Sequence, residues 1–301
     1  MRITQNMVAN QVLRNVTHSL ARLAKSQEQL SSAKRINRAS DDPLGSGVVL
    51  RLKANLERLN GFQRATDAAQ EYLEGAATPL ERIMELLHQA REIAVQGSSD
   101  TLSGTRGPLA EQVNQLLEGL LSEANTRFQE RYVFGGTNTD ATPYTATRDA
   151  SGRITGVASN PLGVDGVINA EVGPDCLVPT NLPGGQTFDR SVNLFEVLIT
   201  LRDALAAEDT AGVAATLTPL DGAMTQVNSA SGVVGVAIRR LEAVRTRNQE
   251  DLIRLESLRS KVQDADIAAV YVELQKLQNA FDASLAAGAR AMQSSLVDYL
   301  Q

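Results

Sequence analysis

The sequence predicts a mainly α protein, an elongated antiparallel rod of long helices that carries a small β-rich inserted domain. None of the nine prolines falls within residues 1–42 or 220–301, whereas five lie between Pro143 and Pro183. Nine of the 22 glycines lie between Gly135 and Gly185, so Pro and Gly divide the chain into helical, irregular and helical thirds. Aromatic residues make up only 4% of the chain, which favours thin bundles built from Leu, Val and Ala.

The first helix is expected from Asn6 to Lys34, because its apolar residues alternate three and four apart as in a heptad seam. The members of this seam are Leu13, Val16, Leu20, Leu23, Gln27 and Leu30. A second helix is expected to begin at Pro43, with Asp42 as its cap.

Two further helix starts are predicted in the N-terminal third. Residues 78–81 (Thr-Pro-Leu-Glu) have the pattern of a capping box with Pro at the first position, so we expect a break or kink there. Another helix is expected from Pro108 to about Phe128.

Residues 138–185 are expected to form the β-rich insert. Residues 131–134 are typical of a strand leading into a Gly-Gly turn, and residues 152–155 and 166–168 are short β-prone pieces between turn residues. The helical rod is expected to supply its own core. Deletion of residues 140–184 is therefore expected to leave folding largely intact.

Helix is expected to resume after Asn193, a cap residue with Glu196 three positions later. A long helix is expected from about 230 to 262, and residues 264–266 (Asp-Ala-Asp) mark the boundary of the last helix. Apolar residues of that last helix recur every eleven residues, which keeps the stripe nearly straight. They are Val270, Leu274, Leu277, Phe281, Leu285, Gly288, Met292, Leu296 and Tyr299.

Charge and hydropathy argue against nucleic acid and membrane as partners. The net charge is −6, and no window approaches the ~18 apolar residues of a membrane span. The N-terminus lacks the apolar core of a signal peptide, so secretion would require a dedicated export machine. Residues 1–40 hold seven basic and one acidic residue, and residues 264–301 hold five acidic and two basic ones. These ends either attract each other or are solvated helix faces.

Residues with catalytic or ligating potential are scarce, so the sequence predicts no enzyme activity, no cofactor and no metal site. Cys176 is alone, and His18 and His88 lie within helical patterns. Asp41 and Asp42 precede Pro43, where helix capping explains them better than paired catalytic carboxylates.

Three stretches, residues 30–43, 90–97 and 264–268, resemble the flagellin superfamily. Residues 131–137 (Arg-Tyr-Val-Phe-Gly-Gly-Thr), the Asp42-Pro43 junction and residues 295–300 resemble its hook-associated branch more than its filament-forming members. The resemblance covers both helical thirds. Ala33 and Ala39 depart from the Gly and Pro common in the family, which puts the local turn shape in question.

This resemblance implies a structural protein of the bacterial flagellum that joins the hook to the filament. It implies residues 1–40 and 264–301 as paired assembly helices, 41–137 and 186–263 as the rod, and 138–185 as an outer insert. It also implies passage through the flagellar export channel to an extracellular position. The implied partners are the first hook-associated protein, flagellin, other copies of the chain in a ring, and a cytoplasmic export chaperone.

The terminal helices are the expected assembly site, because few other segments are available to cover their apolar stripes. We expect both ends to be mobile or loosely helical in the monomer and to order when neighbouring subunits cover them. The candidate assembly residues are Val16, Leu20, Leu23, Leu274, Leu277, Phe281, Leu285, Met292 and Leu296. Two alternatives stay open: a flagellin that forms the filament itself, and an adhesin or enzyme with its activity in residues 138–185.

Overall fold

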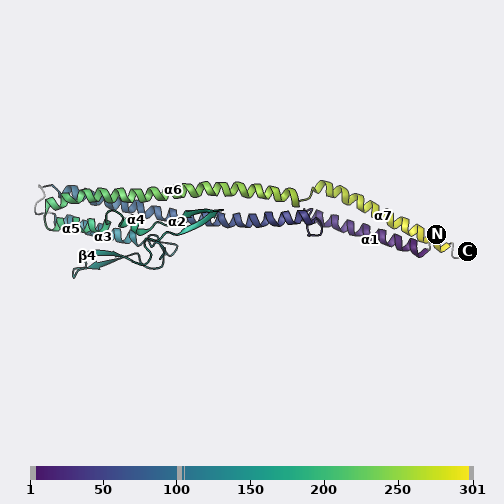
Figure 1. Cartoon of the computed structure of the whole chain (residues 1–301), viewed down its shortest axis with the longest axis horizontal. Coiled ribbons are helices and arrows are strands. Elements are labelled where there is room, and N and C mark those ends of the chain that lie inside the picture. Colours follow the sequence, from purple (N-terminus) through teal and green to yellow (C-terminus); the bar gives the residue numbers. More distant parts are fainter. Residues whose placement is uncertain (1–4, 100–103, 105, 298–301) are drawn as a thin grey trace. The chain divides into compact units, whose positions relative to one another are not determined.

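The computed structural model describes residues 5–99, 104 and 106–297, shown in Figure 1. These residues divide into two compact units, one within residues 1–58 and 251–301 and the other within residues 59–250. The predicted fold class is confirmed, since long helices dominate and the described strands form small two-stranded antiparallel sheets.

The first unit pairs α1 (Gln5–Ser32) with α7 (Ile267–Val297). It also contains the first residues of α2 (Pro43–Gly97) and the last residues of α6 (Thr210–Gln263). Within this unit α1 and α7 run side by side in opposite directions (Figure 1).

Local capping sets the helix starts of the first unit, as the sequence predicts. The Asp42 carboxylate accepts a hydrogen bond from the Gly45 N–H at 2.9 Å, at the start of α2. The Asp266 carboxylate accepts from the N–H groups of Ala268 and Ala269 at 3.0 and 3.1 Å, at the start of α7. Each carboxylate satisfies donors that have no partner inside the helix, so both boundaries follow from short-range chemistry.

The second unit contains the remaining elements together with most of α2 and α6. Its other helices are α3 (Gly107–Ala124), α4 (Gly184–Phe188) and α5 (Leu194–Ala206). Its sheets pair β1 (Arg127–Phe128) with β2 (Arg131–Tyr132), β3 (Tyr144–Arg148) with β4 (Ile154–Ser159), and β5 (Asn169–Gly173) with β6 (Cys176–Pro179). The predicted β-rich character of the insert is confirmed, although residues 166–168 lie just before β5 and not in a strand.

The predicted cap of α5 is also confirmed. The Asn193 side chain accepts hydrogen bonds from the N–H groups of Phe195 and Glu196, both at 3.0 Å. The short side chain reaches back over the first turn, which is why Asn is favoured at this position.

The break predicted at residues 78–81 is wrong, because α2 continues through Pro79. The long helix expected from about residue 230 also begins earlier, since α6 starts at Thr210 and continues through Pro219. A proline inside a helix removes one backbone hydrogen bond and crowds the preceding turn. Burial of an uninterrupted apolar stripe on each helix offsets that cost. The buried stripe of α2 includes Leu73, Ala76, Leu80, Ile83 and Leu87, and that of α6 includes Val213, Leu220, Ala223, Val227 and Val234.

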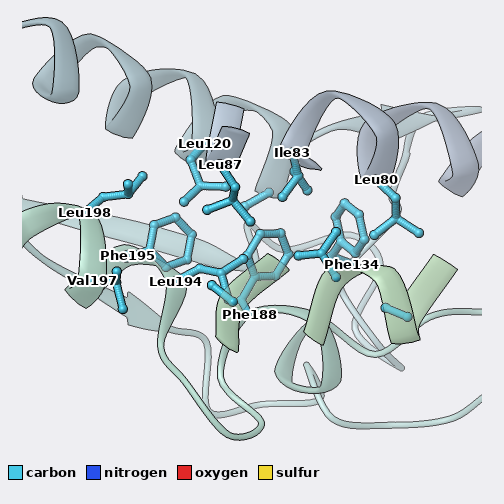
Figure 2. Packing of buried hydrophobic residues seen from close by; sticks show 14 of the residues in the cluster. Leu80, Ile83, Leu87, Leu120, Phe134, Phe188, Leu194, Phe195, Val197 and Leu198 are labelled. Carbon is cyan, nitrogen blue, oxygen red and sulfur yellow. The ribbon is translucent and has the colours of Figure 1, made fainter. Parts of the chain in front are cut away.

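The core of the second unit is continuous and includes side chains of the insert. Four aromatic rings lie at its centre, with Phe188 5.1 Å from Phe134, 5.0 Å from Tyr144 and 5.5 Å from Phe195. Figure 2 shows Phe134, Phe188 and Phe195 facing Leu80, Ile83 and Leu87 of α2 and Leu120 of α3. Residues of the insert buried in the same cluster are Tyr144, Ile154, Val164, Val172, Val178 and Leu182.

Buried polar side chains fasten the insert to the helices. Arg202 of α5 donates to the carbonyl oxygen of Ile154, and Asn248 of α6 donates to that of Val172 at 3.1 Å. Arg202 is 5% exposed and Asn248 4%, so each hydrogen bond lies in a site that excludes water. Such bonds cost free energy when one partner is removed, because the other is left buried without a partner.

The shared core changes the expectation for the insert. Deletion of residues 140–184 would remove six buried side chains of this cluster, among them Tyr144, which packs against Phe188 and Phe195. We now expect this deletion to destabilise the second unit, because the exposed rings would lose their apolar environment.

Candidate assembly surface

The α1–α7 pair is held by contacts spread along both helices. The guanidinium of Arg22 lies 3.2 Å from the carboxylate of Glu273. A Cβ atom on Gly288 would lie 2.7 Å from a methyl group of Val12, so the two helices approach closely at that glycine. These contacts, with the Lys34–Asp264 bridge, fix the antiparallel register.

The predicted assembly residues take different places in this pair. Leu274 and Leu277 are 6% and 8% exposed, so they lie in the seam between α1 and α7. Val16, Leu23 and Phe281 are half-buried. Leu20 and Leu285, in contrast, are 50% and 45% exposed. Met292 and Leu296 lie in α7, but their side chains fall outside the described part of the chain.

Leu13 and Leu20 lie on a second, uncovered line of α1. At about 100° per residue, they sit roughly 60° beyond the half-buried line of Val16 and Leu23, about a sixth of a turn. The predicted heptad seam is therefore wider than the surface that α7 covers, since Leu13 is 66% exposed.

α7 carries a matching uncovered line. Ile267, Tyr271 and Leu285 are 43%, 54% and 45% exposed. Ile267 and Leu285 lie roughly 50°, and Tyr271 roughly 90°, beyond the line midway between Leu274 and Leu277, in the direction in which the helix winds toward its C-terminus. Sequence reasoning missed Ile267 and Tyr271, because they fall outside the eleven-residue repeat. Ile267 and Leu285 are 18 residues apart, which places them above one another on the same face of a helix. That spacing could have revealed the uncovered line from the sequence.

The two uncovered lines lie on the same side of the pair. Two antiparallel right-handed helices turn in opposite senses when viewed from one end. An offset toward higher residue numbers on both helices therefore points to the same side of the plane that contains their axes. The register set by Val12–Gly288 and Arg22–Glu273 also brings Leu13 and Leu285 to nearly the same level. We call Leu13, Leu20, Ile267, Tyr271 and Leu285 the open face.

A compact turn between α1 and α2 borders the helix pair. The N–H groups of Arg35 and Ile36 both donate to the carbonyl oxygen of Gln263, at 2.7 and 3.3 Å. The Ala265 N–H donates to the carbonyl oxygen of Ala33 at 3.0 Å. Main-chain hydrogen bonds thus tie the two helix breaks of this unit together.

Asp41 is the electrostatic centre of that turn. Its carboxylate lies 2.9 Å from the Lys25 ammonium and accepts hydrogen bonds from the N–H groups of Arg38 and Asn37, at 2.9 and 3.2 Å. The Lys25 contact, followed by these backbone donors, lowers the pKa of Asp41 from 3.8 to about 2. The predicted helix-capping role is confirmed for Asp42, whereas Asp41 accepts its backbone hydrogen bonds from turn residues that precede it.

The cysteine and histidine side chains, which could take part in catalysis or metal binding, lie apart from one another. Cys176 is half-buried, with the Arg240 guanidinium 3.8 Å from its sulfur, and both His18 and His88 are exposed. Within the described residues, no three His, Cys, Asp or Glu side chains converge as a metal site would require. No helix among the described residues has the length and apolar character needed to cross a membrane.

The chain matches two family descriptions. Residues 3–139 match the "Bacterial flagellin N-terminal helical region" and residues 217–300 match the "Bacterial flagellin C-terminal helical region". The matched segments include α1 and α7, and residues 140–216 lie between them.

Individual relatives agree with these matches. The chain is 35% identical to a flagellin of Clostridium tyrobutyricum over 128 residues, 41% of this chain and 33% of that protein. It is 30% identical to flagellar hook-associated protein 3 of Escherichia coli over 146 residues, 48% of this chain and 46% of that protein. The chain thus spans between a third and half the length of these relatives.

A solved structure shares the fold. The crystal structure of flagellar hook-associated protein 3 from Legionella pneumophila superimposes with a TM-score of 0.62 at 16% identity, covering 71% of this chain and 98% of that one. The chain belongs to the flagellin superfamily, whose members are structural components of the bacterial flagellum.

Proposed function

We propose that this chain is the structural subunit that joins the flagellar hook to the flagellin filament, and that motility depends on it. The observation that carries the proposal is the open face of the α1–α7 pair. Family membership and the similarity to hook-associated protein 3 support the same role. The role is structural, and no catalytic step forms part of it.

The open face gives this role a physical basis. Burying a Leu or Ile side chain fully contributes roughly 1.5–3 kcal/mol relative to leaving it exposed. Several such side chains lie on one side of the two helices, and the described residues of the unit leave them 43–66% exposed. Apposition of a neighbouring subunit against the open face would gain that free energy, and it would stabilise α1 and α7 at the same time.

The buried and open lines then have separate tasks. Leu274 and Leu277 hold α7 against α1, whereas Leu20 and Leu285 remain available to a neighbour. Val16, Leu23 and Phe281 are half-buried, and we propose that they contribute to both tasks. The domain boundaries proposed from sequence, with residues 1–40 and 264–301 as assembly helices, fit this division of tasks.

We further propose that the neighbours are the first hook-associated protein, flagellin and other copies of this chain in a ring. Export through the flagellar channel would deliver the subunit to its extracellular position. A cytoplasmic chaperone that covers the apolar stripe of α7 before export would prevent premature association. Loosely paired terminal helices suit both steps, because the seam between them is narrow.

The test is complementation of a strain that lacks this gene, scored by motility and by microscopy of flagella. Leu285→Asp places a charge on the open face, and we expect hooks without filaments and flagellin shed into the medium. The matched control is Val272→Asp, on the same helix and 52% exposed, but on the opposite side from the seam. We expect filaments in the control. The free energy of unfolding of both purified variants should lie within about 0.5 kcal/mol of the wild-type value, because substitutions at exposed positions rarely cost more.

Normal filaments on cells that carry Leu285→Asp would refute the role of the open face. Equal loss of filaments in both variants would show that the effect of the introduced charge does not depend on which face of α7 carries it.

A filament-forming flagellin is the competing structural role, and the identity to the Clostridium tyrobutyricum flagellin motivates its test. Purified protein incubated with filament seeds decides between them: a junction subunit adds a limited layer, whereas a flagellin elongates the seed. An adhesin or enzyme activity in residues 138–185 is tested by glycan-binding and hydrolysis assays on the full chain.

A further inference from the structure

A pocket in the second unit lies between the segment that leads into α5 and the side of α6. Its volume is 430 Å³, within the range of about 300–1,000 Å³ of small-molecule sites. Its lining includes the apolar side chains of Leu182, Ala230 and Val233 and the exposed polar side chains of Gln186 and Arg190. Ser191, Thr225 and Ser229 add hydroxyl groups along the wall.

The wall of this pocket is held rigidly by Gln226, which is 8% exposed. Its side-chain oxygen accepts hydrogen bonds from the N–H groups of Ser191 and Val192, at 2.8 and 3.2 Å. Its side-chain nitrogen donates to the carbonyl oxygens of Thr187 and Val192, at 3.0 and 3.1 Å. All four hydrogen-bonding positions of this amide are used, so the segment beside the pocket is preorganised.

Arg190 brings a positive charge that the fold does not neutralise. No described residue forms an ion pair or hydrogen bond with its guanidinium, and no described residue lining the pocket is acidic. Two carboxylates adjacent in sequence to lining residues of the pocket, Asp189 and Asp221, make contacts outside it. Asp189 accepts from the Asn193 side chain at 2.7 Å, and Asp221 pairs with Arg91 at 2.7 Å.

We propose that this pocket binds a small organic carboxylate with an apolar body. The planar guanidinium of Arg190 presents two parallel N–H donors, which match the two oxygens of a carboxylate. A single guanidinium balances one negative charge, and the apolar lining residues Leu182, Ala230 and Val233 accept the hydrocarbon part of the ligand. This inference does not depend on the junction role, because the pocket lies in the second unit and the open face in the first.

The test is a calorimetric titration of the full chain at low salt with four probes. N-acetyl-leucine carries both the carboxylate and the apolar body, and its amide lacks only the charge. Glucuronate and inorganic phosphate carry charge without an apolar body. We expect saturable binding of N-acetyl-leucine and at least tenfold weaker binding of the other three.

Variants separate Arg190 from general charge. Arg190→Gln should weaken the binding of N-acetyl-leucine at least tenfold, and Arg190→Lys should weaken it less. Arg239→Gln, an exposed arginine on α6 outside the pocket, is the matched control and should change nothing. Absence of saturable binding to the wild type, equal binding by Arg190→Gln, or phosphate binding as tightly as N-acetyl-leucine would overturn the proposal. Each titration is independent of filament assembly, so it fails or succeeds separately from the junction role.

Discussion

The two units of this chain cover their apolar residues to different degrees. In the second unit helices, strands and the insert surround one core, and residues such as Phe188 and Leu198 are 0% exposed. In the first unit one apolar line of α1 and one of α7 cover each other, whereas the residues of the open face beside them are 43–66% exposed. A pair of helices has only one shared seam, so an apolar stripe wider than that seam requires a further partner.

Aromatic residues follow the same division. Phe134, Tyr144, Phe188 and Phe195 contact one another in the core of the second unit, where their large surfaces are fully used. On α7, by contrast, Tyr271 is 54% exposed. The comparison teaches that the second unit has the core of a stable domain, whereas the first resembles one half of an interface.

The largest expected effect is on the second unit. Phe188→Ala removes the ring at the centre of the aromatic cluster, and we expect the free energy of unfolding to fall by about 3–5 kcal/mol. Chemical denaturation followed by circular dichroism measures it. Leu285→Ala, on the open face, should change this free energy by less than about 0.5 kcal/mol. A loss below about 1 kcal/mol for Phe188→Ala would mean that the core is not continuous.

The next effect concerns the closeness of α1 and α7. Gly288→Ala puts a methyl group 2.7 Å from Val12, and overpacking of this kind costs about 1–3 kcal/mol. We expect faster proteolysis of residues 267–290 in this variant. Val12→Ala in the same chain should restore the wild-type rate, because it removes the opposing methyl groups. A double variant that is cleaved as fast as Gly288→Ala alone would contradict the antiparallel register of α1 and α7.

The smallest expected effect is the pH dependence of the turn between α1 and α2, which contains Asp41. The lowered pKa of Asp41 means that its ionised carboxylate stabilises the turn above the ordinary pKa of 3.8. That contribution is lost as the pH falls through about 2. The amide proton of Arg38, which donates to this carboxylate, should therefore shift in NMR spectra with a midpoint near pH 2. A midpoint near 3.8, or the same titration in Asp41→Asn, would show that the contacts with Lys25 and the backbone are absent.

Short-range signals in the sequence predict much of this fold. Asp42, Asn193 and Asp266 start their helices as expected, because a cap acts through side chains and N–H groups two or three residues away. Pro79 misleads, since its local cost is outweighed by burial of α2 against segments distant in sequence. The shared core was missed for the same reason: Tyr144 and Phe188 are 44 residues apart, and no periodicity links them.

The candidate site was predicted in outline only. The sequence indicates that the terminal helices carry apolar stripes, and Leu20 and Leu285 are among the residues selected from it. Which line of each stripe faces the other helix depends on their mutual rotation. That rotation is set by contacts such as Val12 with Gly288, which a single sequence does not reveal.

Amide hydrogen exchange on the dilute monomer tests the central claim most directly. If the first unit is completed by its neighbours, the amides of α7 between residues 267 and 297 should exchange quickly, while those of α3 and α5 stay protected. Assembly onto hooks should then slow the exchange in α7. Strong protection of α7 in the dilute monomer would contradict this account, because it would show that the helix pair is already stable without a partner on its open face.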